Sequence, residues 1–118
     1  MNLSAPDSYL PLPESSYYIL LSLISSKKHG YAIMKDVEDL SQGELLLSAS
    51  TLYTALGRLL DHGLIARIEN PLKEEQGPGL PRKVYNLTKL GREVLEAEAA
   101  RLEKLVSVTR VRLSQEAE

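Results

Sequence analysis

The 118-residue sequence contains no cysteine. Disulfides, thiolate metal sites and cysteine nucleophiles are therefore excluded, and we expect a cytoplasmic protein. A long apolar run is also missing, because the longest one, Tyr17 to Ile24 with Ser22 inside it, is far too short to span a membrane. Residues 1–13 contain no lysine, no arginine and no long apolar segment, so we expect no signal peptide.

A large excess of one charge is absent as well. The chain has 14 basic and 16 acidic side chains, a net charge of −2. This balance argues against a disordered charged tail and a polybasic membrane anchor, and any nucleic-acid site must depend on a local cluster of charge. The length predicts one domain with a modest core, for which association with a second subunit would add buried surface.

Proline is confined to two short stretches, residues 6–13 and 71–81. Because proline disrupts helix interiors, the residues between and after these stretches are free to form regular structure. We therefore predict an irregular N-terminal arm over residues 1–13 and a loop over Asn70–Arg82, a segment that is also rich in glycine and charge.

Apolar spacing and capping residues predict the regular elements. Ser48 or Ser50 is expected to cap the third helix, Gly63 to end it, and Thr88 to cap the fourth. The predicted helices and strands are Glu14–Ser26, Tyr31–Leu40 and Ser50–His62 (helices), Leu64–Glu69 and Val84–Leu87 (strands), and Lys89–Leu113 (helix).

This order of elements predicts a mainly α fold with a small β-hairpin, the winged helix-turn-helix. Residues 14–88 would form the DNA-binding domain with three helices and a two-stranded wing, and residues 89–118 a long C-terminal dimerisation helix. In helix-turn-helix proteins the second helix of the pair enters the major groove. Here that helix is Ser50–His62.

The outer side of that helix carries small hydroxyl residues, which can approach DNA closely and bond to bases or phosphates. At about 100° per residue, Ser50 and Thr54 point away from the core and Thr51 and Tyr53 lie on its flanks. A helix start rich in serine and threonine is also typical of a simple capping region. We predict that DNA is contacted by Lys35, Ser50, Thr51, Tyr53, Thr54, Arg82 and Lys83, with Lys35 on the backbone and the last two at the base of the wing.

Residues that would support catalysis are sparse. Both histidines, His29 and His62, precede glycines at helix ends, where capping is the more ordinary role. No phosphate loop, nucleophile elbow or zinc-binding spacing is present. We predict neither enzyme activity nor a cofactor or metal.

Two helices carry more apolar surface than one small domain can cover. The first predicted helix is apolar on most sides, and the last has a broad stripe of leucine and valine that continues past the domain. Packing within one chain is the simpler explanation of such a stripe, but its length favours a partner. The predicted homodimer interface comprises Tyr17, Leu20, Leu95, Leu102, Leu105 and Val106.

Several segments together closely resemble the PadR family of winged-helix transcriptional regulators. The resemblance covers about residues 15–106 and is carried by residues 19–23, 29–33, 48–59, 63–65, 82–88 and Gly91. Two positions depart from the family pattern. Ala49-Ser50 replaces a frequent Pro-Gly, which would alter the lead-in to the recognition helix, and Val84 replaces a frequent aromatic residue, which would alter wing packing.

The resemblance implies a dimeric repressor that binds double-stranded operator DNA and responds to a small molecule, often an aromatic one. The chain has no tryptophan or phenylalanine and no aromatic residue in its fourth helix, so stacking of a ligand there is not expected. Tyr17 and Tyr18 are the nearby aromatic candidates. An effector bound elsewhere, or no effector at all, is left open.

A different class of function also fits the fold: a winged helix that binds protein rather than DNA. The net acidity and the Lys73-Glu74-Glu75 segment of the predicted loop favour it. Convergence of the predicted basic and hydroxyl residues on one face would favour DNA. Steep dependence of binding on salt would do the same, because phosphate contacts release counterions.

Overall fold

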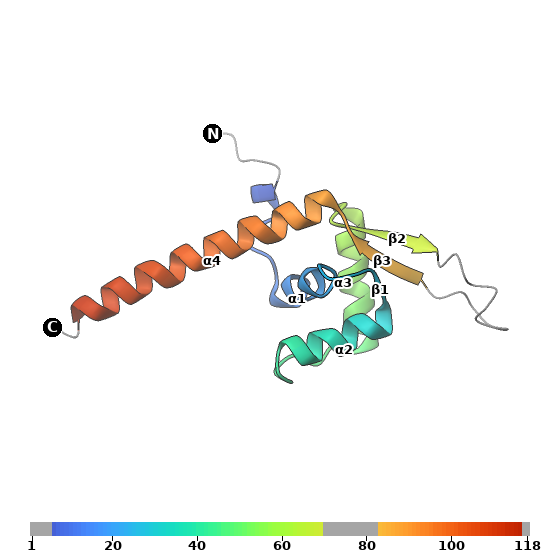
Figure 1. Cartoon of the computed structure of the whole chain (residues 1–118), viewed down its shortest axis with the longest axis horizontal. Coiled ribbons are helices and arrows are strands. Elements are labelled where there is room, and N and C mark those ends of the chain that lie inside the picture. Colours follow the sequence, from blue (N-terminus) through green and yellow to red (C-terminus); the bar gives the residue numbers. More distant parts are fainter. Residues whose placement is uncertain (1–5, 70–82, 117–118) are drawn as a thin grey trace.

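A computed structural model describes residues 6–69 and 83–116 of the chain (Figure 1). The predicted loop Asn70–Arg82 and both extreme ends lie outside the described residues. The elements, in chain order, are the 3-10 helix η1 (Pro6–Tyr9), α1 (Glu14–Ser22), β1 (Lys28–His29), α2 (Gly30–Leu40), α3 (Ala49–Asp61), β2 (Ile65–Glu69), β3 (Lys83–Leu87) and α4 (Lys89–Glu116). The predicted fold class, a mainly helical winged helix-turn-helix, is confirmed.

The first helix is shorter than the sequence predicted, ending at Ser22 instead of Ser26. The Lys28 ammonium reaches back to the end of α1 and donates a 2.6 Å hydrogen bond to the Ser22 carbonyl oxygen. Lys28 also forms an ion pair with Asp36 of α2, 3.8 Å away. A helix continued to Ser26 would leave too little chain to bring Lys28 into a strand, so tertiary pairing decides where α1 ends.

The sheet has three strands instead of the predicted two. β1 is a two-residue strand that pairs antiparallel with β3, placing Lys28 opposite Tyr85 and His29 opposite Val84. β2 pairs with the other edge of β3, so the order is β1-β3-β2. Two residues carry no periodic pattern, and the sequence therefore had no signal for β1.

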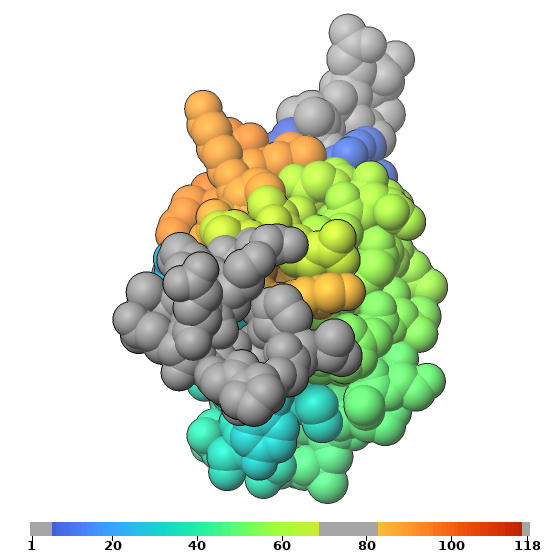
Figure 2. Space-filling model, turned by 90° about the vertical axis from the view of Figure 1, so that its right-hand side faces the viewer, coloured from blue at the N-terminus to red at the C-terminus, as the bar shows by residue number. Residues whose placement is uncertain are grey.

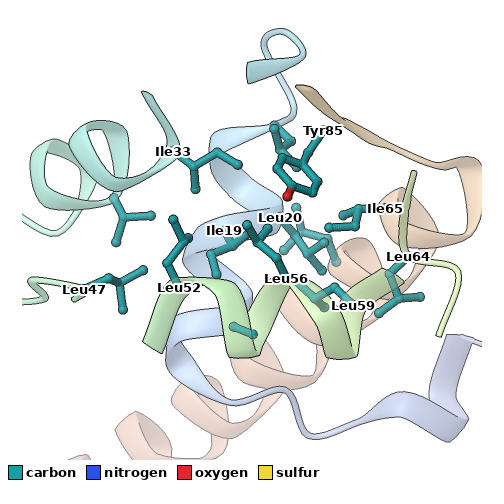
Figure 3. Packing of buried hydrophobic residues seen from close by; sticks show 14 of the residues in the cluster. Ile19, Leu20, Ile33, Leu47, Leu52, Leu56, Leu59, Leu64, Ile65 and Tyr85 are labelled. Atoms are coloured by element: carbon teal, nitrogen blue, oxygen red, sulfur yellow. The ribbon is translucent and has the colours of Figure 1, made fainter. Parts of the chain in front are cut away.

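One apolar core joins α1, α2, α3 and the first half of α4 to the sheet (Figure 3). Leu52, Leu56 and Leu59 recur along one side of α3 and point at Ile19 and Leu20 of α1. Tyr85, Ile65 and Leu64 close the core from the sheet side. The recognition helix predicted from the sequence thus has one completely buried face and one face turned to solvent.

Both ends of α3 are fixed by the residues that the sequence suggested. Ser48, and not Ser50, is the N-cap, and its Oγ accepts a hydrogen bond from the Thr51 backbone N–H at 3.1 Å. Gly63 follows the helix with a φ of +74°, a left-handed conformation that glycine adopts without strain. The Leu64 N–H then bonds back to the Leu59 carbonyl at 3.0 Å.

The predicted irregular arm is held against the body of the protein. Its residues Pro6–Tyr9 form η1, which packs on α4. The ring of Tyr9 lies 5.3 Å from that of His62 at the end of α3. The backbone N–H of Leu12 donates a 2.8 Å hydrogen bond to the Glu98 carboxylate. The arm therefore links the end of the recognition helix to the middle of α4.

Glu98 is an acidic side chain buried on the inner face of α4, only 1 % exposed. Arg101 binds both of its carboxylate oxygens, at 2.6 and 3.0 Å. These two bonds, together with the Leu12 N–H and the positive charge of Arg101, lower the pKa of Glu98 from its ordinary value, although burial opposes them. The carboxylate is therefore the form that holds the arm.

Because the folded protein has the lower pKa, Glu98 contributes stability above its ordinary pKa near 4.5 and loses that contribution as the pH falls further. We expect Glu98→Gln to lower the free energy of unfolding at pH 7 by about 1–3 kcal/mol. The difference from the parent protein should shrink below pH 4.5. Urea unfolding across this range measures it, and Glu96→Gln, an exposed position on the same helix, is the control. A difference independent of pH would show that the charge of Glu98 does not matter.

The long fourth helix was predicted to Leu113 and continues to Glu116. Its first half packs on the domain through Gly91, Val94, Leu95 and Glu98. Its second half extends away from the body of the protein (Figure 1). At about 100° per residue, the face that is buried in the first half continues as Leu102, Leu105, Val106 and Leu113, all of which are exposed.

Candidate nucleic-acid interface

The predicted contact residues of α3 all lie in its first two turns and are exposed. Ser50, Thr51, Tyr53 and Thr54 are turned to solvent, while Leu52 between them is completely buried. The Ser48 hydroxyl donates a 3.0 Å hydrogen bond to Thr51 Oγ1, so the capping residue also orients the Thr51 hydroxyl. The capping residue Ser48 therefore also holds the exposed hydroxyl of Thr51, so the capping role is confirmed and the predicted contact with DNA stays a prediction.

Lys35 lies on α2, close to the residues that precede the first turn of α3. It lines a shallow hollow of about 140 Å³ together with Tyr31, Met34, Glu38, Leu46 and Leu47. Leu47 immediately precedes the N-cap Ser48. Lys35 is exposed, and an ammonium at this point can approach a phosphate of a duplex whose major groove holds α3.

The wing contributes two exposed basic residues within the described part of the chain. Lys83 begins β3, opposite Glu69 of β2, and Arg67 of β2 pairs with Tyr85. Arg67 was not among the predicted contact residues, although a basic residue inside a predicted strand next to the proline- and glycine-rich loop was the available signal. Arg82, the other predicted wing residue, lies outside the described residues.

The beginning of α2, the helix α3 and the strands β2 and β3 share one side of the molecule. Figure 2 views this side, with α3 in green, the start of α2 in cyan, β2 in yellow-green and β3 in orange. The elements that carry the predicted hydroxyl and basic residues are therefore neighbours in space. This arrangement is the one that a winged helix needs to place a helix in the major groove and a wing beside it.

Tyr53 is half exposed, but its hydroxyl group does not extend into solvent. It lies against Gly30, the first residue of α2, whose missing side chain leaves the space that the hydroxyl occupies. Burial is the main cause that raises the pKa of Tyr85, and the nearby Tyr53 hydroxyl raises it further while Arg67 lowers it. Tyr53 thus contacts the first residue of α2 and lies near the wing strand β3.

The predicted dimer residues separate into two groups. Leu20 and Leu95 are at most 4 % exposed inside the core of the single chain, so neither has surface to offer a partner, and the prediction for these two is corrected. Leu95 was misassigned because the apolar stripe of α4 packs into the core in its first half and is exposed in its second. Leu20 was misassigned because the face of α1 that carries it packs into the same core. Leu102, Leu105 and Val106 are exposed, and Tyr17 is partly buried.

A cavity of about 520 Å³ lies between α1 and α4. Tyr17, Tyr18, Arg101 and Leu102 contribute to its wall, with Leu12 of the arm and Glu98. Its volume falls in the range of small-molecule sites. The two tyrosines that the sequence offered as aromatic candidates therefore line the same space.

Among residues 6–69 and 83–116, no three histidine or acidic side chains come together as a metal site. Within the same residues, no helix combines the length and apolar character needed to cross a membrane.

Comparison with protein families gives a match over residues 19–97 to the transcriptional regulator PadR-like family. The comparison with curated proteins gave no match. The matched residues include the last turn of α1, all of α2 and α3, the strands β1, β2 and β3, and the first part of α4.

Solved structures agree with the family match. A PadR family transcription regulator from Clostridium difficile is 29 % identical, with a TM-score of 0.69, over 86 % of this chain and 99 % of that one. A PadR-like transcription factor from Bacteroides fragilis is 31 % identical, with a TM-score of 0.59, over 81 % and 87 %. Bacillus subtilis PadR, solved in complex with operator DNA, is 28 % identical with a TM-score of 0.60 over 70 % of this chain and 44 % of that one.

Proposed function

We propose that this chain, which belongs to the PadR-like family of transcriptional regulators, binds a specific operator as a homodimer and represses transcription. Members of the family are transcription regulators and not enzymes. The observation that carries the proposal is the exposed hydroxyl row at the start of α3, which lies on the same side of the molecule as the strands β2 and β3 (Figure 2). Lys35 lines a hollow with Leu47, the residue before the N-cap of α3.

The DNA contacts divide by chemistry. Ser50, Thr51 and Thr54 face the major groove and read or touch base edges, with the exposed part of the Tyr53 ring beside them. Lys35 binds the phosphate backbone next to the groove. Arg82 and Lys83 anchor the wing to phosphate or to the minor groove, and we add Arg67 to this group. Because it acts on DNA, we assign the protein to the cytoplasm.

The second copy of the chain covers the exposed half of α4. Leu102, Leu105 and Val106 continue a helix face that is already apolar and packed in its first half, which supports a helix-to-helix contact there. Tyr17 contributes from α1. A twofold pair places its two recognition helices about one turn of DNA apart, roughly 34 Å, so the operator is near-palindromic.

A small aromatic effector fits the cavity between α1 and α4 better than the surface of α4. Two tyrosine rings and apolar side chains surround the cavity, and Arg101 supplies a polar end. The same space borders the proposed dimer contact through Leu102. A ligand there would alter how α4 sits on the domain, and relief of repression is the expected outcome.

Fluorescence anisotropy on DNA from upstream of the protein's own gene, with random DNA of equal length, tests the proposal. We expect tight, salt-sensitive binding with a preference for the upstream fragment. Weak and equal binding to both fragments, insensitive to salt, would instead favour the alternative, a winged helix that binds a protein.

The phosphate contacts predict a specific change in salt dependence. Lys35→Ala combined with Lys83→Ala should weaken binding to all sequences and flatten the slope of log K against log salt by about 4, because the dimer loses two phosphate contacts from each of its two chains and each contact contributes about one unit. Anisotropy titrations at several salt concentrations measure this slope. Lys104→Ala, exposed on α4, is the matched control and should leave the slope unchanged.

Thr51 should matter for specificity. Thr51→Ala removes a groove-facing hydroxyl but keeps the backbone N–H that Ser48 caps, so the helix start persists. We expect the upstream fragment to lose about tenfold in affinity and random DNA to lose little, because base contacts are worth about 1–3 kcal/mol. Thr51→Ser should retain most of the binding. Equal losses on both DNAs would make Thr51 a phosphate contact or a cap partner.

A further inference from the structure

Gly30 is the first residue of α2, and its lack of a side chain has a spatial reason. Only Gln42, Gly43 and Gly63 have a positive φ within the described residues, so the backbone at Gly30 is open to any L-residue. A Cβ added at Gly30 would lie 2.6 Å from the Tyr53 hydroxyl oxygen and 3.2 Å from Tyr53 Cζ. Its next neighbour, Leu52 Cδ2, would be at an ordinary distance of 3.5 Å. Space for the Tyr53 hydroxyl is therefore what requires a glycine.

The position of Tyr53 makes this contact relevant to DNA. Tyr53 lies on the flank of α3, between Leu52, which is buried, and Thr54, which is exposed. Its ring extends sideways to the first residue of α2, beside the edge strand β1 that pairs with β3. The Tyr53 side chain thus connects α3, to which it belongs, with the start of α2, next to the wing.

We propose that Gly30 and Tyr53 form a seat that positions the recognition helix, and that Tyr53 acts through this seat and not through its hydroxyl on DNA. The inference rests on the proposed DNA-binding function. The seat holds the hydroxyl end of the ring against the start of α2, which leaves Ser50, Thr51 and Thr54 free to enter the groove. A methyl group at position 30 pushes the half-exposed ring outward, into the space where DNA would approach.

Three variants test the seat: Gly30→Ala, Tyr53→Phe and the two combined. Gly30→Ala should weaken binding to the upstream DNA fragment about tenfold or more, while Tyr53→Phe should stay within about twofold of the parent. The combined variant should recover most of the lost affinity, because the closest remaining approach is 3.2 Å to Cζ instead of 2.6 Å to the oxygen. Gly57→Ala is the control glycine for stability only, since its Cβ would meet nothing within 4 Å of the protein but lies on the recognition helix one turn after Thr54.

Two outcomes would overturn the proposal. In the first, Tyr53→Phe alone loses much of its affinity for the upstream DNA fragment, and the combined variant loses the product of the two single losses. That result would mean that the hydroxyl contacts DNA directly. An unchanged affinity for Gly30→Ala would mean that the seat does not position the helix.

Urea unfolding of the same four proteins without DNA separates this proposal from the proposed function. Rescue of Gly30→Ala stability by Tyr53→Phe would establish the seat even if the parent protein bound neither DNA fragment specifically. Failure of the proposed function would then appear as absence of specific binding in all four proteins. Rescue of stability without rescue of DNA affinity would leave a packing contact only and would overturn the positioning role.

Discussion

Gly91→Ala should destabilise the protein more than a glycine-to-alanine substitution at any other glycine of residues 6–69 and 83–116. The added Cβ would lie 2.0 Å from the Leu64 carbonyl oxygen and 2.9 Å from its carbon. That carbonyl already accepts a hydrogen bond from the Thr88 backbone N–H, so the sheet cannot simply move aside. The first turn of α4 must shift away from Leu64, the residue before β2, instead.

The shift strains two further bonds. Thr88 Oγ1 accepts from the Gly91 N–H at 3.0 Å and donates to the Gly63 carbonyl at 2.7 Å. Alanine is favoured over glycine in a helix by about 1 kcal/mol, which opposes the clash but does not match it. We expect a net loss of about 3 kcal/mol in the free energy of unfolding.

Thermal unfolding measures the Gly91 effect, with an expected fall in Tm of about 10 °C. Gly57→Ala is the matched control, because its Cβ would meet nothing within 4 Å. That variant gains helix propensity and should be as stable as the parent or more stable by about 1 kcal/mol. A Gly91→Ala protein as stable as Gly57→Ala would show that α4 does not approach β2 as closely as described.

Leu105→Arg should abolish the proposed homodimer. Leu105 is 49 % exposed in the single chain and lies on the face of α4 that continues the packed residues Val94 and Leu95. An arginine there costs the chain alone little, because the residue is solvent-exposed. In a twofold contact it would place two buried, unpaired charges opposite apolar side chains, which is strongly unfavourable.

Light scattering should therefore give the mass of one chain for Leu105→Arg and of two chains for the parent protein. Affinity for the upstream DNA fragment should fall about 100-fold, because each recognition helix would bind its half-site alone. Ser107→Arg adds the same charge on a different side of α4 and is expected to remain dimeric. An unaltered mass for Leu105→Arg would exclude this face as the interface.

The sequence by itself determined the order and type of the main elements. Three helices, two strands of the wing and a long fourth helix were predicted because each has a long periodic pattern or a capping residue whose action is local. Gly63 and Thr88 fall into this second group, since a left-handed turn and a hydroxyl cap depend on neighbours within a few residues. The winged helix-turn-helix followed from this order.

Local signals left several features undecided. Nothing in two residues shows that Lys28 and His29 form a strand, because the partner strand lies more than fifty residues further along the chain. The early end of α1 depends on the same pairing. The burial of Leu20 and Leu95 depends on how α1 and the first half of α4 pack into one core.

Tertiary structure alone also decided the roles of Glu98 and Gly30. An acidic residue between Leu95 and Leu102 interrupts the apolar face of α4, and that interruption was a readable sign. Its partner, the Leu12 N–H, is 86 residues away in the chain. Likewise, the reason for a glycine at position 30 is a tyrosine hydroxyl from another helix. Periodicity describes which side of an element is buried, whereas only the packed chain determines what fills the space beside it.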